Sequence, residues 1–106
     1  MKNSKRKKLE RAGWRVAGVQ ELLDLTEAEV ALIEMKCTLM QLVRDTRNDK
    51  NITQIALAEL MQSSQSRVAK LEAESSDVSL DLIVRALFAL GVTNRQLAEA
   101  LLESPN

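Results

Sequence analysis

A chain of 106 residues, 45% of them hydrophobic and only 2% aromatic, can form one domain with a modest aliphatic core and short extensions. Three glycines and one proline favour an all-α fold over a β-sandwich, which needs more turn residues. With no histidine and a single cysteine, neither a Cys/His nucleophile pair nor a His/Cys zinc cluster can form. We therefore expect no enzyme activity, no metal site and no cofactor.

The chain also lacks targeting features. No apolar stretch approaches the roughly 18 residues of a membrane span, and no apolar segment follows the basic N-terminus as in a secretory signal. The lone cysteine, Cys37, excludes an intramolecular disulfide and fits a reducing cytosol, so we expect a cytoplasmic protein. Cys37 itself fits a small buried residue better than the alternative, a redox sensor.

The formal net charge is zero, from 15 Lys/Arg and 15 Asp/Glu, but the charges are unevenly placed. Residues 1–15, the basic N-terminal segment, carry seven Lys/Arg against one Glu, whereas residues 16–36 carry one against five. Because attraction to phosphate is screened beyond about 8–10 Å, a local basic segment matters more for nucleic acid than the total charge. The alternative is a solubilising tail that contacts nothing.

The N-terminal half is expected to lead into one long helix. Residues 1–8, MKNSKRKK, form an arm, and a short helix can begin near Val19. Thr26 and Glu29 then have the spacing of a capping box, in which each side chain accepts from the other residue's backbone amide. The long helix follows over about 27–49.

Two short helices joined by a tight turn are expected next. Thr53 is a good N-cap for the first, over about 54–61, and Ser64 is a good N-cap for the second, which ends near Glu72. The turn between them, MQSS, spans 61–64. Short helices connected by three or four residues fit a helix-turn-helix.

A polar loop, AESSD (73–77), separates this pair from two C-terminal helices. Ser79 starts the first of them, which ends at Gly91, and VTNRQLAEALLE (92–103) forms the second. Together they carry more apolar surface than a small core needs, which favours a homodimer, although each residue is equally well explained as core. The residues concerned are Leu87, Phe88, Leu90, Leu97, Leu101 and Leu102.

The helix pair shows apolar and small residues where the two helices must meet. On helical spacing, Leu57, Ala58 and Met61 face inward from the first helix, and Val68 and Leu71 face inward from the second. Ala58 falls where the helices cross closely, so a larger side chain there would push them apart.

The opposite face of the second helix is polar and comprises Gln65, Ser66, Ala69 and Lys70. Glutamine can bind adenine through two hydrogen bonds, serine can donate or accept, and lysine can reach a guanine edge or a phosphate. The N-terminus of a helix also favours phosphate. This face is therefore typical of a helix that enters the DNA major groove, and the alternative is an ordinary solvated surface.

The segments TQIALAELMQSSQSRVAKLE and LIVRALFALGV resemble the Cro/CI-type, or Xre, family of helix-turn-helix regulators, from about Leu39 to Val92. The resemblance implies a five-helix DNA-binding domain with its third helix in the major groove. It implies a phosphate contact for Gln54, at the start of the preceding helix. It also implies that Gln65, Ser66 and Lys70 of the third helix contact bases, that Arg67 contacts a base or a phosphate, and that Ser64, the cap of that helix, contacts DNA.

The resemblance further implies an ion pair between Arg47, late in the long helix, and Glu72, at the end of the third. Arg47 follows Leu39 and Val43 at i+8 and i+4 on the inward stripe, with Met40 beside them. An arginine in that position needs a buried partner, and Glu72 is a suitable one. We expect this pair to stabilise the fold.

Two features depart from the family pattern. Gln62 stands at a turn position that is usually glycine, so a non-glycine residue must adopt the tight, left-handed conformation. Glu74 and Asp77 make the next loop acidic, where the family often has basic or neutral residues near phosphate. Both indicate weaker DNA binding per monomer, with a dimer or the basic N-terminal segment compensating.

The segment ahead of the domain, KLERAGWRVAGVQELLDLTEAEVALIEMK, is similar to that of HigA-type antitoxins. This resemblance implies a protein that neutralises a RelE/HigB-class ribonuclease toxin and represses the operon they share. Partner contacts would come from Trp14, Leu22 and Leu23, although Trp14 is equally well explained as an anchor of the extension on the long helix. The alternatives are a stand-alone Xre-type regulator and a protein-interaction module that binds no DNA.

The expected organisation has two parts. Residues 1–26 form the basic arm and a short helical extension, and residues 27–106 form the helix-turn-helix domain with C-terminal dimerisation helices. The expected activity is sequence-specific transcriptional repression in the cytoplasm, in association with the nucleoid. The expected partners are an operator of double-stranded DNA, a second copy of the chain and a toxin protein, with no membrane.

Overall fold

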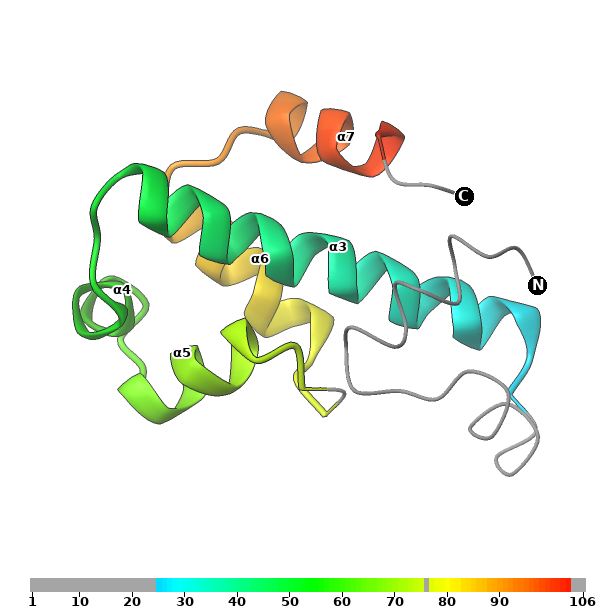
Figure 1. The fold of residues 1–106 in the computed structure, drawn as a ribbon, viewed down its shortest axis with the longest axis horizontal. Coiled ribbons are helices and arrows are strands. Elements are labelled where there is room, and N and C mark those ends of the chain that lie inside the picture. Colours follow the sequence, from blue (N-terminus) through cyan, green and yellow to red (C-terminus); the bar gives the residue numbers. More distant parts are fainter. Residues whose placement is uncertain (1–24, 76, 104–106) are drawn as a thin grey trace.

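The computed structural model describes residues 25–75 and 77–103, and this part of the chain forms five helices and no strand (Figure 1). The expected all-α, five-helix fold is therefore confirmed. The expected arm, the short helix near Val19 and the side chains of Trp14, Leu22 and Leu23 lie outside the described residues. The helices are α3 (Glu27–Asp49), α4 (Gln54–Leu60), α5 (Gln65–Glu72), α6 (Leu80–Ala89) and α7 (Asn94–Leu102).

Each described helix begins at a hydroxyl side chain that caps it. The Thr26 hydroxyl accepts from the Glu29 amide at 3.1 Å, and the Glu29 carboxylate accepts from the Thr26 amide at 3.1 Å, which completes the predicted capping box. Such a cap contributes about 0.5–2 kcal/mol, so short polar side chains decide where these helices start. The other four caps are Thr53, Ser64, Ser79 and Thr93.

Left-handed backbone conformations reverse the chain after four of the helices. Gln62 has φ 53°, which confirms that a non-glycine residue takes this conformation in the turn after α4. Asn51 and Glu74 do the same after α3 and α5, each with φ 56°, whereas Gly91 has φ 87° after α6. A side chain in this region costs about 1–2 kcal/mol, a cost that glycine avoids.

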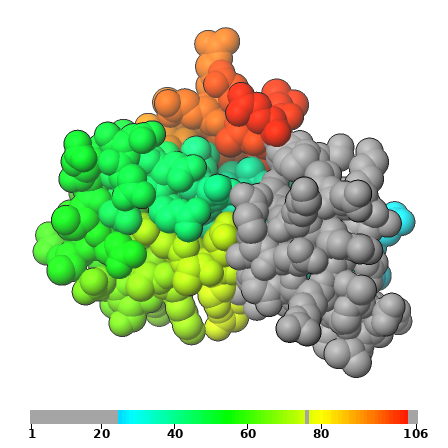
Figure 2. Space-filling view, in the orientation of Figure 1, coloured from blue at the N-terminus to red at the C-terminus, as the bar shows by residue number. Residues whose placement is uncertain are grey.

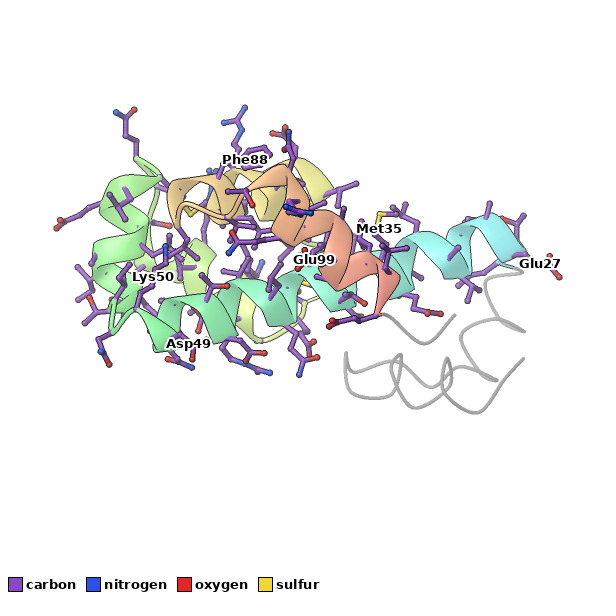
Figure 3. The ribbon with its side chains drawn as sticks, turned by 90° about the horizontal axis from the view of Figure 1, so that it is seen from above. Glu27, Met35, Asp49, Lys50, Phe88 and Glu99 are labelled. Atoms are coloured by element: carbon purple, nitrogen blue, oxygen red, sulfur yellow. The ribbon has the colours of Figure 1, made fainter. Side chains whose placement is uncertain are left out.

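Helix α3 forms the axis of the domain. It has 23 residues, and Glu27 and Asp49 mark its two ends (Figure 3). It contacts α5, α6 and α7, while α4 packs against α5 and α6. Helix α7 lies on one side of α3, and α4 and α5 lie on the other (Figure 1). None of the described helices is both long and apolar enough to cross a membrane.

The core is aliphatic, as the composition predicted, and unites all the helices except α7, which contributes half-buried residues at its edge. Cys37 is one of the buried residues of α3. In the helix pair Leu57, Ala58, Val68 and Leu71 are buried, as expected from their spacing. Met61, also expected inside, is half-buried and packs against the same core.

The apolar residues of the last two helices divide between core and surface. Leu87 and Leu90 are buried, and Leu97 and Leu101 are half-buried against the core. These four therefore belong to the monomer. Two others remain exposed, namely Phe88 at 51% and Leu102 at 83%.

Helix α3 carries a buried acidic side chain, Glu34, that forms no hydrogen bond with the described residues. Glu34 is 1% exposed, and neither of its carboxylate oxygens has a hydrogen-bond partner among the described residues. A buried, unsatisfied polar group costs about 1–3 kcal/mol, and more when it carries a charge.

Replacing Glu34 with methionine, which has a similar volume and no charge, is expected to raise the free energy of unfolding by about 1–3 kcal/mol. Urea denaturation measures this change. Glu59→Met on the exposed surface of α4 is the matched control and should stay within about 0.5 kcal/mol of wild type. A loss of stability in Glu34→Met would contradict the reading of Glu34 as an uncompensated carboxylate.

Candidate nucleic-acid interface

Helices α4 and α5 are joined by a turn that the backbone closes tightly. The Ser63 amide donates to the Ala58 carbonyl at 2.8 Å, and the Gln62 amide donates to the Glu59 carbonyl at 3.1 Å. Ala58 is only 5% exposed where α4 packs on α5. A small residue at this position lets the two helices approach, as its place in the sequence predicted.

The outward face of α5 is polar and open to solvent. Val68 and Leu71 bury the inner side of the helix, with 1% and 0% exposure. The residues on its other side are all exposed. Helices α4 and α5 lie on the side of α3 that is opposite to α7 (Figures 1 and 2). This set contains Gln65, Ser66, Arg67, Ala69 and Lys70. The structure thus places four sequence-predicted site residues on one short helix.

Ser64, a fifth predicted site residue, has a structural task as well. Its hydroxyl oxygen accepts from the Arg67 amide at 3.2 Å and so caps α5. Ser64 is exposed and directly precedes Gln65, so it lies at the N-terminal end of α5.

The predicted partners Arg47 and Glu72 meet beneath this surface. Arg47 Nε and Nη2 donate to the two oxygens of Glu72, the second at 2.7 Å, and Arg47 Nη1 donates to the Ile52 carbonyl at 2.7 Å. Their side chains are 14% and 6% exposed. The hydrogen bond to Glu72 and its charge raise the pKa of Arg47 further, while burial opposes them, so the guanidinium stays charged. This bidentate pair ties α3 to the end of α5.

Two further residues, neither of them predicted from the sequence to do so, also contact Glu72. Gln54, predicted only as a phosphate contact, is half-buried and donates from Nε2 to Glu72 Oε1 at 3.3 Å. Arg44 Nη1 approaches the Glu72 carbonyl at 3.5 Å, a long contact. The i, i+3 spacing of Arg44 and Arg47 on α3 is a sequence signal that could have indicated a second arginine near this site.

Beside α5 lies a shallow cavity of about 360 Å³ that extends to the start of α6. Lys70 Nζ and Asp77 Oδ2 are 3.3 Å apart at its edge, and Arg85 and Asp81 pair at 3.0 Å. The Ser75 hydroxyl also donates to Asp77, and this bond, followed by Lys70, lowers the pKa of the Asp77 carboxyl. Charges of both signs therefore border the polar face of α5.

Nothing in the described part of the chain groups three or more acidic or cysteine side chains in a way that could hold a metal ion. The site consists of amide, hydroxyl, guanidinium and ammonium groups on a helix surface. These groups bind by hydrogen bonds and charge.

Two short helices joined by a tight turn, the second exposing a polar face, define a helix-turn-helix protein. The chain belongs to a family described as a helix-turn-helix domain, whose profile matches residues 22–94. That match extends from before α3 to the first residue of α7 and so includes the whole interface described above. Comparisons with curated proteins and with solved structures found no significant match.

Proposed function

We propose that this protein is a sequence-specific DNA-binding repressor of transcription, and that α5 enters the major groove. The observation that carries the proposal is the division of α5 into two faces. Val68 and Leu71 hold the helix on the core, while Gln65, Ser66 and Lys70 stay exposed. The major groove, about 12 Å wide, admits a helix, and these side-chain types match base edges there. The protein acts by binding, and the proposal assigns it no catalytic step.

Each polar residue has a separate role in this proposal. Gln65 bonds adenine, and Ser66 and Lys70 contact neighbouring base edges, with Arg67 serving base or phosphate. Ser64 contacts phosphate at the helix start. Gln54 contacts phosphate from α4. Its Nε2 has two hydrogens, and the bond to Glu72 uses one of them, so the other is available to donate to phosphate.

A dimer follows from the size of the contact. One recognition helix covers only about four to six base pairs, and two half-sites about 34 Å apart supply useful specificity. Phe88 and Leu102, which the monomer leaves exposed, are the apolar residues proposed to meet a second copy. The basic N-terminal segment is proposed to add phosphate contacts.

Replacing Gln65 with alanine is expected to relax the preference at one base pair and to cost about 1–3 kcal/mol on the preferred sequence. Replacing Gln54 with alanine should instead weaken binding to all sequences alike. The measurement selects a preferred duplex from a random pool with wild type, then compares its single-base variants across the three proteins. Equal losses on preferred and random duplexes for Gln65→Ala would exclude its base contact.

A more specific role rests on the extension, residues 1–26. We propose that the protein is the antitoxin of a two-protein system, cytoplasmic and nucleoid-associated, which neutralises a RelE/HigB-class ribonuclease. The support is the resemblance of the segment from Lys8 to Lys36, with Trp14, Leu22 and Leu23 as partner contacts.

Co-purification from the native operon tests the antitoxin role. A neighbouring gene product that elutes stoichiometrically with the chain, and is lost when residues 1–25 are deleted, would support it. A chain that elutes alone yet binds its own promoter would be a stand-alone regulator. A chain that binds only protein would be an interaction module.

A further inference from the structure

The ammonium group of Lys70 is already engaged when no DNA is present. It lies 3.3 Å from Asp77 Oδ2, across the gap between α5 and the loop that follows. The other Asp77 oxygen accepts from the Ser75 hydroxyl, so the carboxylate is held from two directions. Lys70 thereby has a fixed anionic partner at the edge of the proposed base-contacting face.

This pair is exposed and therefore weak. The side chains of Lys70 and Asp77 are 64% and 66% exposed, and water screens such pairs strongly. An exposed ion pair stabilises only weakly, whereas a base-edge hydrogen bond in the major groove discriminates strongly, so Lys70 leaves Asp77 when DNA binds. Opening the pair still opposes binding, because the free protein keeps the pair and the complex loses it.

We propose that Asp77 competes with DNA for Lys70, because their ion pair must open before Lys70 can contact a base or a phosphate, and that Asp77 thereby lowers the affinity for DNA. The inference rests on the proposed DNA-binding function and deepens it. Arg67 and Arg85 border the same cavity, and Arg85 is likewise engaged by Asp81 at 3.0 Å. Asp77 on the loop and Asp81 on α6 thus each pair with a cation that would otherwise attract phosphate.

The competition persists across physiological pH. The hydrogen bond from Ser75 and the nearby Lys70 lower the pKa of Asp77, so the carboxyl stays ionised wherever the protein works. The chain has no histidine to titrate in this range. The effect of Asp77 should therefore be the same from about pH 6 to 8.

Asp77→Asn tests the inference because asparagine keeps the shape and the acceptor for Ser75 but removes the charge. The probes are a random-sequence duplex and a duplex selected by wild type from a random pool. Affinity for the random duplex should rise about three- to tenfold at 50 mM salt, with a log–log salt slope steeper by about one. Affinity for the selected duplex should rise by at least as much, because Lys70 leaves Asp77 completely when it contacts a base.

Glu99→Gln is the matched control. Glu99 pairs with Arg95 at 3.6 Å on α7, on the opposite side of α3 from α5 (Figures 1 and 3). The substitution removes the same charge and should leave both affinities unchanged. Thermal unfolding of each variant checks that the fold is intact.

A second variant separates competition for Lys70 from general repulsion. In a Lys70→Ala background, Asp77→Asn should no longer raise the affinity for either duplex. An effect of Asp77→Asn that equals that of Glu99→Gln, or that persists in full without Lys70, would overturn the inference while wild type still binds DNA. A wild-type chain that binds neither duplex would instead overturn the proposed function itself.

Discussion

Arg47→Ala is expected to lower the free energy of unfolding by about 3–5 kcal/mol, the typical cost of removing one partner of a buried ion pair. Arg47 makes two hydrogen bonds to Glu72 and a third to the Ile52 carbonyl, with both charged side chains largely shielded from water. Removing the guanidinium leaves the Glu72 carboxylate with the weaker bond from Gln54 as its remaining side-chain partner among the described residues. Because the pair joins α3 to α5, the loss falls on the element proposed to contact DNA.

Urea denaturation of Arg47→Ala, followed by circular dichroism, measures this loss. The control is Arg95→Ala, which breaks the exposed pair with Glu99 and should cost at most about 1 kcal/mol. The double variant Arg47→Met with Glu72→Met should be less destabilised than Arg47→Ala, because no buried charge remains. An Arg47→Ala protein that unfolds like wild type but loses DNA binding would show that Arg47 contacts DNA and does not hold the fold.

The second large effect is expected at Leu71, one position along from a proposed DNA contact. Leu71→Ala should cost about 2–5 kcal/mol, because its fully buried side chain leaves a cavity where α5 meets the core. Lys70→Ala, at the adjacent exposed position, should change stability by no more than about 0.5 kcal/mol. The order reverses for DNA, since Lys70→Ala should weaken binding while leaving a folded domain.

The comparison of Leu71→Ala with Lys70→Ala tests the orientation of α5 directly. Chemical denaturation measures stability, and binding to the selected duplex is measured under conditions where both variants are folded. Equal stability losses at the two positions would mean that α5 does not have the inward and outward faces described here.

Local features of the fold could be predicted from sequence because their causes are local. Thr26, Thr53 and Ser64 bond to amides three residues on, so the cap and the helix start appear together in the sequence. The left-handed conformation of Gln62 was expected for a different reason, because the family pattern places a glycine at this turn position.

The contacts around Glu72 depend on packing between distant segments. Arg47 was predicted as its partner from an inward stripe and a family resemblance, but Gln54 and Arg44 lie 18 and 28 residues away and have no periodic relation to it. Sequence likewise showed an acidic loop containing Asp77 without showing that its carboxylate lies beside Lys70. Such pairings appear only when the helices have been placed.

The structure was also needed to show which of the C-terminal leucines are buried. Leu87 and Leu102 are equally apolar in sequence, yet one is fully buried under α3 and the other is 83% exposed. Helical periodicity shows which residues share a face. How deeply each residue is buried depends on how far along its helix the neighbouring helices extend.

DNA binding by α5 is tested most directly by the affinity of the full chain for duplex DNA as a function of salt. Binding to the selected and random duplexes would be measured by fluorescence anisotropy between 50 and 200 mM salt. If α5 binds DNA, the chain should bind both duplexes and prefer the selected one. The logarithm of the affinity should fall linearly with the logarithm of the salt concentration as phosphate contacts are lost. An affinity that does not change with salt, or no binding to either duplex, would contradict DNA binding by α5.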